Sequence, residues 1–360
     1  MRKEIAFIIP YPIGLAPSQR FRFEQYSNFL EESYKLSFFP FLTKNDFKLL
    51  YQPRKYFYKS WIIVKGFLKR LILMFQLRGY SIVFIHREAS PIGPPIFEWI
   101  IHKILKKKII YDFDDAIWLK NTSTSNRLIS TIKRHSKVSS ICKWSSLVMC
   151  GNHFLMDYAK KYTKNVIYLP TTIDTVNVHN QVKNQVEGIT TIGWTGTHST
   201  IKYLYDIESL LVKLQNQINF RFVVISNKDP FFKDLKYEYK SWIKETEIND
   251  LLQFDIGIMP LLNDEWANGK CGFKALQYMS LGIPCVISPV GVNIKIIQNG
   301  FNGFLVENEN EWKGKLTALI KSKELRTTIG LAGKETVLNN YSVKSTKNLY
   351  LTCFNQVING

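Results

Sequence analysis

The sequence predicts an α/β protein built from two successive, doubly wound parallel sheets. Short apolar runs bounded by polar or turn residues alternate with longer segments of helical periodicity along all 360 residues. This alternation is typical of parallel strands that are joined by helices. The length corresponds to about two domains, and a hydrophobic content of 46% is ample for two sizeable cores.

The apolar runs define two series of strands. The first series is expected at Glu4 to Pro10, Ser81 to His86, Lys108 to Phe113, Ser146 to Met149 and Val166 to Leu169; the second is expected at Ile189 to Trp194, Phe220 to Ile225, Phe254 to Pro260, Pro284 to Ser288 and Gly303 to Val306. The series change near Pro170 to Gly188, a polar stretch that follows a strand. We therefore expect domains at residues 1–172 and 189–341, a linker at 173–188, and a last segment at 342–360 whose helix can return to the first domain.

Several classes of protein are disfavoured. The apolar stretch near the N-terminus covers only Ile5 to Pro10, which fits a buried strand better than a signal peptide. No window approaches 18 uninterrupted apolar residues, so a membrane-spanning helix is not expected. Five scattered cysteines without C-x-x-C spacing argue against a disulfide framework or a zinc site: Cys142, Cys150, Cys271, Cys285 and Cys353. A reducing cytoplasm is the natural location.

The positive charge is concentrated in the first half of the chain. Residues 1–150 hold 25 basic and 10 acidic residues, whereas residues 151–360 hold 23 and 19. The segment Tyr51 to Tyr80 mixes basic residues, among them Arg54, Lys65, Lys69 and Arg70, with large apolar residues. It fits either a helix on an anionic membrane surface or a core-facing helix with a solvated basic face. The cluster Lys103 to Lys108 can extend the same surface, and no motif for nucleic acid is present.

The run from Gln253 to Val306 predicts an anion site. Two short buried strands in it enclose a helix with an apolar face, which opens at Gly272 between Lys270 and Lys274. A helix start with unpaired N–H groups, a glycine and two lysines suits a diphosphate. An ordinary βαβ unit with solvated lysines is the alternative.

In this second half the chain resembles the GT-B glycosyltransferases, specifically the retaining group 4 type. The matching pieces are PTTID at residues 170–174, IGWTGTHSTIKYL at 192–204, FDIGIMPLL at 254–262, GFKALQYMSLGIPCVIS at 272–288 and NGFNGFLV at 299–306. The first half resembles a subgroup of these enzymes through APSQRFRFEQY at 16–26, IHREASPIGPP at 85–95, IIYDFDDAIW at 109–118 and GNHFLMDYA at 151–159. The resemblance implies two Rossmann-like domains that face each other across a cleft, with the donor on the second and the acceptor on the first.

The chain departs from the family pattern at the donor site. The family has two glutamates eight positions apart, and the corresponding residues here are Gly269 and Gln277. Gln277 can still bind ribose hydroxyls, and Asp264 or Glu265 can supply an acid if the loop is longer. The usual arginine is also missing, since Trp194 follows Gly193.

The resemblance assigns the remaining donor residues. Lys202 corresponds to a phosphate-contacting lysine, and we infer that Lys270 and Lys274 supply the charge of the missing arginine. The N–H groups of Gly196 and Thr197 are further candidates for the diphosphate. Charge builds on the departing nucleoside diphosphate during transfer, so such donors lower the barrier.

Retention without a metal, as the family implies, lets the leaving phosphate accept the acceptor's proton, so no cofactor and no separate strong base are expected. On the acceptor domain, Asp114, Asp115 and His86 are candidates to orient the acceptor hydroxyl or donor sugar, with helix capping by the aspartates as the alternative. Arg20 and Arg22 are candidates for a lipid-linked diphosphate. Asp112 and Asp114 have the D-x-D form, but on this domain we assign no metal.

The sequence thus predicts a glycosyltransferase that uses a nucleoside diphosphate sugar to build a surface polysaccharide on a lipid-linked or glycan acceptor, peripheral to the inner face of a membrane. Two alternatives stay open. One is a nucleotide-sugar epimerase of similar architecture. The other is a membrane-surface scaffold with a degenerate nucleotide pocket.

Overall fold

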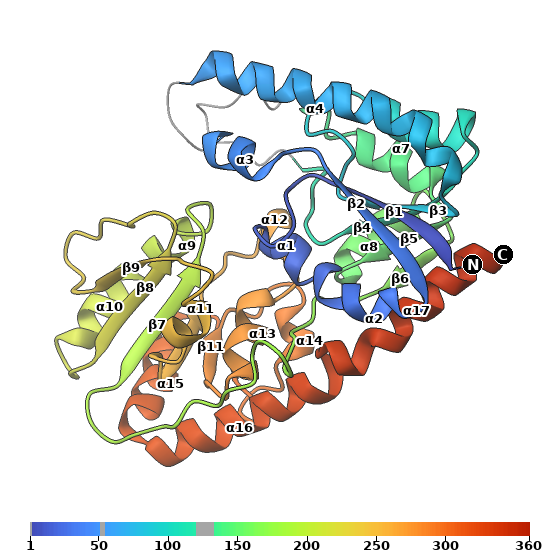
Figure 1. Ribbon diagram of the computed structural model, residues 1–360. Helices are drawn as coiled ribbons and strands as arrows, with labels where there is room; N and C mark the ends of the chain where they lie inside the picture. Colours follow the sequence, from blue (N-terminus) through green and yellow to red (C-terminus); the bar gives the residue numbers. More distant parts are fainter. Residues whose placement is uncertain (1, 51–54, 120–132) are drawn as a thin grey trace. The chain divides into compact units, whose positions relative to one another are not determined.

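The computed structural model describes residues 2–50, 55–119 and 133–360. Arg54, part of the expected basic helix, lies outside these residues. The chain divides into two compact units, one formed by Met1–Thr171 with Lys347–Gly360 and the other by Thr172–Thr346 (Figure 1). Each unit holds one six-stranded parallel sheet, so the predicted α/β class with two doubly wound sheets is confirmed.

The sheet of the first unit has the strand order β2-β1-β3-β4-β5-β6. Its strands are β1 (Lys3–Ile9), β2 (Tyr34–Pro40), β3 (Ile82–His86), β4 (Lys108–Phe113), β5 (Leu147–Cys150) and β6 (Val166–Tyr168). β3 and β5 are buried along their whole length, which explains their uninterrupted apolar sequences. β2 was not anticipated from the sequence. It is an edge strand, and all its residues after Tyr34 are partly or fully exposed, so it lacks a continuous buried run.

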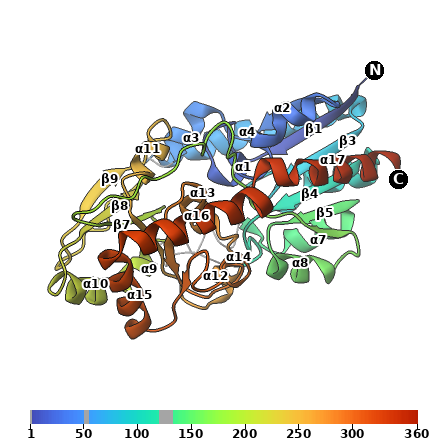
Figure 2. The ribbon, with the colours of Figure 1, turned by 90° about the horizontal axis from the view of Figure 1, so that it is seen from below.

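Helices and shorter helical turns flank this sheet. They are α1 (Pro17–Arg20), η1 (Glu24–Tyr26), α2 (Ser27–Glu31), α3 (Lys44–Leu50), α4 (Tyr56–Gln76), η2 (Leu77–Gly79), α5 (Ile96–Trp99), the π-helical turn η3 (Ile100–Ile104), α7 (Lys137–Trp144), α8 (His153–Lys160) and α17 (Val343–Asn359). α17 runs along the sheet (Figure 2), and the ring of Phe354 lies 6.1 Å from that of Phe7 and 5.9 Å from that of Phe84. These aromatic contacts fix the end of the chain in the first unit.

The sheet of the second unit has the order β12-β11-β10-β7-β8-β9. Its strands are β7 (Thr191–Gly196), β8 (Arg221–Ser226), β9 (Glu238–Ser241), β10 (Ile256–Met259), β11 (Cys285–Ile287) and β12 (Phe304–Leu305). β9 was also not predicted from the sequence. It is an edge strand with the sequence EYKS, in which no residue is fully buried.

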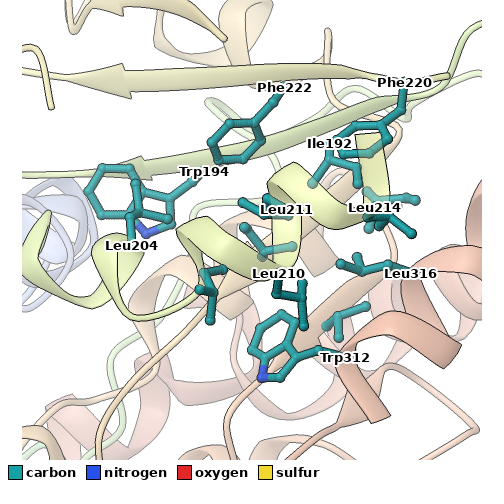
Figure 3. Close-up of a cluster of buried hydrophobic side chains, with 14 of the residues drawn as sticks. Ile192, Trp194, Leu204, Leu210, Leu211, Leu214, Phe220, Phe222, Trp312 and Leu316 are labelled. Atoms are coloured by element: carbon teal, nitrogen blue, oxygen red, sulfur yellow. The ribbon is translucent and has the colours of Figure 1, made fainter. Parts of the chain in front are cut away.

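The helices of the second unit enclose its core. They are α9 (Lys202–Tyr205), α10 (Glu208–Gln215), α11 (Glu247–Leu251), α12 (Glu265–Asn268), α13 (Phe273–Ser280), α14 (Asn293–Ile296), α15 (Glu309–Lys321) and α16 (Lys323–Asn340). Leu211 and Leu214 of α10 and Leu316 of α15 pack with Ile192 and Phe222 of the sheet (Figure 3). This cluster holds the sheet rigid beneath its carboxyl edge.

Residues 173–188, expected as a linker, pack along the second unit. The ammonium of Lys183 lies 2.9 Å from Asp255 Oδ1, and Arg326, only 1% exposed, donates to Gln185 and to the carbonyl of Val186. The polar residues that indicated a linker therefore form an ion pair and hydrogen bonds with the second unit. Among the helices of the described residues, none is long and apolar enough to cross a membrane.

Candidate functional site

The loops after β7, β10 and β11 meet at the carboxyl edge of the second sheet, because the strands are parallel. The last of the residues between β10 and α13 is Gly272, which has a left-handed backbone with φ of 67°. A Cβ at this position would lie 2.3 Å from Ile296 Cδ1. Only glycine fits both conditions. Having no side chain, Gly272 makes no side-chain cap hydrogen bond to the first turn of α13.

The three predicted lysines each rest on an aromatic ring. The ammonium of Lys270 lies 4.6 Å from the centre of the Trp266 ring, that of Lys274 lies 5.2 Å from Trp194, and that of Lys202 lies 4.8 Å from Tyr203. Cation–π contacts of this kind help to hold an ammonium in place. The lysines are therefore positioned cations at the carboxyl edge of the sheet.

Trp194 also connects Lys274 with the loop after β7. A Cβ on Gly196 would lie 2.4 Å from the Trp194 ring, so glycine is needed there for packing. The N–H of Thr197 donates to Thr200 Oγ1 at 3.3 Å. The structure thus places both Gly196 and Lys274 next to the Trp194 indole. The N–H of Thr197, which we predicted to bind the diphosphate, already donates within the loop.

Gln277 has a partner that the sequence did not reveal. Its side-chain amide donates to Glu247 Oε1 at 3.3 Å, and the indole N–H of Trp242 donates to the same oxygen at 3.1 Å. Gln277 and Glu247 are 2% and 6% exposed. Glu247 lies 30 positions upstream of Gln277, just after the unanticipated strand β9, so no motif spacing could have found it. A carboxylate is therefore present beside the position where the family pattern has a glutamate.

Of the two acids considered as replacements for the other glutamate, Asp264 is the N-cap of α12 and accepts the N–H of Ala267 at 2.6 Å. Glu265 is exposed in the first turn of that helix. The Asp264 carboxylate therefore has a structural task at the helix start, and Glu265 faces solvent.

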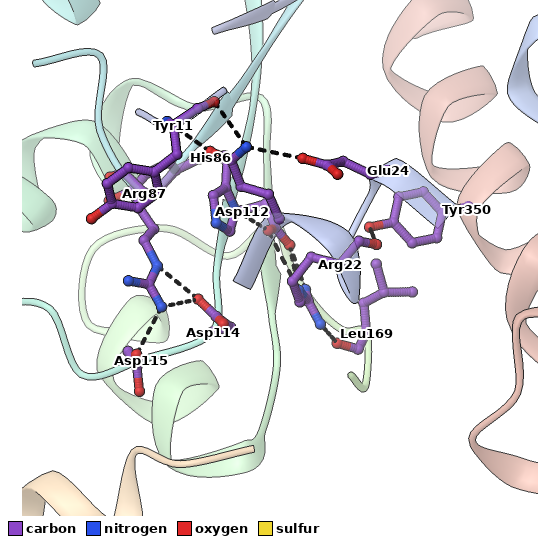
Figure 4. A network of polar contacts seen from close by, with 12 residues as sticks. Tyr11, Arg22, Glu24, His86, Arg87, Asp112, Asp114, Asp115, Leu169 and Tyr350 are labelled. Atoms are coloured by element: carbon purple, nitrogen blue, oxygen red, sulfur yellow. Dashed lines mark hydrogen bonds and ion pairs between the residues drawn. The ribbon is translucent and has the colours of Figure 1, made fainter. Parts of the chain in front are cut away.

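The first unit holds a buried polar cluster at the carboxyl ends of β3 and β4 (Figure 4). Asp112 accepts hydrogen bonds from the Arg22 guanidinium and from His86 Nδ1, the latter at 2.7 Å. Because an ionised carboxylate only accepts, His86 carries its proton on Nδ1. Burial alone would raise the pKa of Asp112, but the charge of Arg22 and the hydrogen bond from His86 outweigh it and lower this pKa to about 2.

Two predicted site residues of this cluster, Arg22 and His86, are buried. Arg22 is 1% exposed and also donates to the carbonyl of Leu169, while the Tyr350 hydroxyl of α17 donates to the Arg22 carbonyl. Its observed contacts make it a structural residue of this cluster, and the contact with a lipid-linked diphosphate stays a prediction. His86 is fully buried, and its Nε2 has no hydrogen-bond partner among the described residues. Its observed contact positions Asp112. Arg20, half-buried beside them, places its guanidinium 4.9 Å from the Phe21 ring.

Asp114 and Asp115 are bound by Arg87, which was not predicted as a site residue from the sequence. Arg87 donates to Asp114 Oδ1 at 2.8 Å and to Asp115 Oδ2 at 2.7 Å. Its backbone is left-handed, with φ of 59°, and Tyr111 donates to its carbonyl. A non-glycine residue in this conformation is strained and is often found at functional sites. The side chain of Asp114 is 13% exposed and that of Asp115 is 19% exposed, so both can still contact a ligand.

The geometry gives no support to a D-x-D metal site. Asp112 faces Arg22 and His86, whereas Asp114 faces Arg87. Across the described ranges, no group of three or more histidine, cysteine, aspartate or glutamate residues is arranged to hold a metal ion.

Comparisons with known proteins identify the second unit. Residues 189–322 match the family model described as "Glycosyl transferases group 1". The second unit is thus similar to glycosyltransferases of group 1 over these residues. The match agrees with the predicted glycosyltransferase class, and the three lysines, Gly272 and Gln277 all lie within the matched residues.

A curated relative agrees with this assignment over a short segment. It is an uncharacterized glycosyltransferase of Methanocaldococcus jannaschii, 39% identical over 66 residues. The match covers 18% of this chain and 19% of that protein.

Solved structures share the fold of the whole chain. Sucrose-phosphate synthase from Thermosynechococcus elongatus matches with a TM-score of 0.69 at 12% identity, and a glycosyltransferase from Rickettsia africae matches with 0.70 at 13%; each match covers 99% of both chains. HepE of Anabaena, solved in complex with UDP, matches with 0.60 at 11% identity, covering 99% of this chain and 100% of that one. The predicted GT-B fold is confirmed.

Proposed function

We propose that the whole chain is a retaining, metal-independent glycosyltransferase. It moves a sugar from a nucleoside diphosphate sugar to a lipid-linked or glycan acceptor, in the synthesis of a surface polysaccharide at the inner face of a membrane. No cofactor takes part beyond the donor substrate. The observation that carries the proposal is the pair Lys270 and Lys274 around Gly272, inside the residues that match the glycosyltransferase group 1 model.

The chemistry follows from the charge of the leaving group. As the glycosidic bond to the donor breaks, negative charge builds on the nucleoside diphosphate. Lys270, Lys274 and the start of α13 then stabilise that charge more strongly than they stabilise the intact donor, which lowers the barrier. Because aromatic rings hold the ammonium groups of Lys270 and Lys274, these side chains need little rearrangement during the transfer. The leaving phosphate accepts the proton of the acceptor hydroxyl on the same face, so the sugar keeps its anomeric configuration.

Gln277 and Glu247 provide a neutral and an anionic hydrogen-bonding group at one place in the donor domain. A carboxylate accepts from hydroxyl groups, and the amide oxygen of Gln277 adds a second acceptor. Together they suit the vicinal hydroxyls of a ribose. In this chain the pair takes the role that one family glutamate has alone.

Nucleotide binding tests the proposal most directly. A thermal-shift panel of UDP, GDP, ADP and CMP should reveal at least one ligand that stabilises the protein, by about 2.7 kcal/mol at a hundredfold excess over its dissociation constant. UDP is the first choice because HepE of Anabaena, of the same fold, is solved with UDP. The variants Lys270→Ala and Lys274→Ala should each weaken binding about tenfold or more, since a charge-assisted contact contributes about 1.5–3 kcal/mol.

Lys315→Ala is the matched control, because its ammonium also rests on a ring, that of Phe304 at 5.0 Å, but on α15. It should leave nucleotide affinity unchanged. Absence of any shift across the panel would support the degenerate scaffold instead. Conversion of the donor sugar without an acceptor would indicate an epimerase, and loss of transfer in EDTA would contradict metal independence.

A further inference from the structure

The outward face of α4 is apolar. Its exposed large side chains are Phe57 at 92%, Trp61 at 61%, Val64 at 48%, Leu68 at 51%, Leu71 at 49%, Ile72 at 60% and Phe75 at 77%. They recur mostly at three- and four-residue spacing and therefore form one stripe along the helix. Soluble proteins rarely expose a contiguous apolar face of this kind unless it contacts a partner or a membrane.

The opposite face of α4 fixes the helix to the sheet. Arg70, 1% exposed, donates to the carbonyls of Ile9, Phe39 and Ala89 at 2.8, 2.8 and 2.7 Å. These carbonyls lie at or just beyond the carboxyl ends of β1, β2 and β3. A Cβ at Gly66 would lie 2.3 Å from the Phe41 ring, so the helix approaches this edge closely. The exposed stripe is thus the outer side of a helix that is anchored at the carboxyl ends of β1, β2 and β3.

The surroundings of the stripe are cationic. α4 contains no acidic residue, and Asp46, which faces it from α3, is only 7% exposed and pairs with Lys65 at 3.5 Å. Lys107 donates to the carbonyls of Arg78 and Tyr80, which brings the cluster at residues 103–108 to the end of α4. Trp99 of α5 and Ile104 of η3 are also exposed, at 44% and 59%. α5 contacts α4 through the rings of Phe97 and Phe67.

We infer that α4 is an interfacial helix that inserts its apolar stripe into an anionic membrane and holds the carboxyl edge of the first sheet at the lipid surface. The acceptor class that fits is accordingly a lipid-linked saccharide and not a soluble glycan. The lipid-linked acceptor rests on the proposed function, whereas the membrane insertion of α4 does not. A helix with an apolar face and a basic rim lies in the interface plane, about 5–10 Å deep, in keeping with the absence of a spanning helix in the described parts of the chain.

The charges favour a membrane over a second copy of the chain. Two copies joined through α4 would bring two basic rims together without acidic partners on the helix, which opposes association. An anionic lipid surface supplies the complementary charge, worth about 1 kcal/mol per basic residue near the surface. Anionic lipid is therefore the partner that fits this face of α4.

Vesicle sedimentation of the full chain tests the insertion. The protein should pellet with vesicles of phosphatidylglycerol and phosphatidylethanolamine, and much less with phosphatidylcholine alone. The triple variant Phe57→Ser, Trp61→Ser, Phe75→Ser should bind about a hundredfold or more weakly, because three large side chains lose their lipid contacts. The matched control Phe231→Ser, Ile294→Ser, Leu331→Ser removes exposed apolar residues of the second unit and should bind as the wild type does.

Equal pelleting of the two triple variants would overturn the inference, as would a stable dimer in light scattering that dissociates in the α4 variant and does not bind vesicles. The nucleotide shift separates the proposals. Nucleotide binding without vesicle binding removes the membrane surface alone, and vesicle binding without nucleotide binding removes the transferase alone.

The acceptor class is tested by donor turnover with one saccharide in two forms, attached to a polyprenyl diphosphate in those vesicles or free in solution. The vesicle form should react faster, and the α4 variant should lose that advantage while keeping its rate on the free form. Equal rates of the wild type on both forms would contradict the lipid-linked assignment.

Discussion

At the scale of single residues, Asp112 is the acceptor at the centre of the buried polar cluster in the first unit. Its carboxylate is fully buried between Arg22 and His86, and its pKa is lowered to about 2. The sequence indicated this aspartate only as part of a D-x-D pattern. The three residues are separated by up to 90 positions, so nothing local could reveal that they form one cluster. The same holds for Arg87, whose partners are 27 and 28 positions away.

The lowered pKa predicts how acid affects stability. Because the pKa of Asp112 is lower in the folded than in the unfolded chain, its contribution is fully present above about pH 4 and is lost as the pH falls toward 2. The contribution is about 2 kcal/mol. Urea unfolding at several pH values should show this loss in the wild type but not in Asp112→Asn.

At neutral pH the same Asp112→Asn variant should be destabilised by about 3–5 kcal/mol, since it removes one charge of the buried ion pair with Arg22. Identical pH profiles of wild type and variant would contradict the ion pair. Leu331→Ser, a change at an exposed position, serves as the control for general effects of substitution.

At the scale of elements, the start of α13 carries the proposed donor site. Its strand, loop and helix were predictable because the buried runs around β10 and β11 are uninterrupted and Gly272 marks a helix boundary. The edge strands β2 and β9 were not predictable from apolar runs, since their exposed residues carry no continuous buried pattern. α4 was predicted as a basic, apolar helix, but its sequence fitted two orientations equally well.

Gly272→Ala should destabilise the protein by about 1–3 kcal/mol, because it adds a Cβ to a left-handed backbone and a close contact with Ile296. Nucleotide affinity should fall as well. Gly314→Ala is a suitable comparison: Gly314 lies inside α15 with nothing within 4 Å of its ideal Cβ. That change should stabilise by up to about 1 kcal/mol. Thermal and chemical unfolding of both variants measure the difference, and equal effects would refute the role of the left-handed glycine.

At the scale of the whole molecule, the two units are expected to respond to different ligands. Hydrogen exchange of the full chain should show that a bound nucleoside diphosphate protects residues 193–203 and 260–277 of the second unit. Anionic vesicles should instead protect residues 57–76 of α4. Protection of α4 by the nucleotide alone, or of the donor loops by vesicles alone, would contradict this division of tasks.

The sequence by itself predicted the α/β architecture and the proposed donor motif. Both depend on patterns that are local in the chain: buried strand runs, a helix boundary at Gly272 and lysines two positions to either side of it. Tertiary structure decided what depends on contacts between distant residues. It buried Arg22 and His86, paired Gln277 with Glu247, and bound Arg70 to three carbonyls so that the apolar side of α4 faces outward. Burial and pairing are set by packing across the fold, and a single sequence does not contain the distances on which they depend.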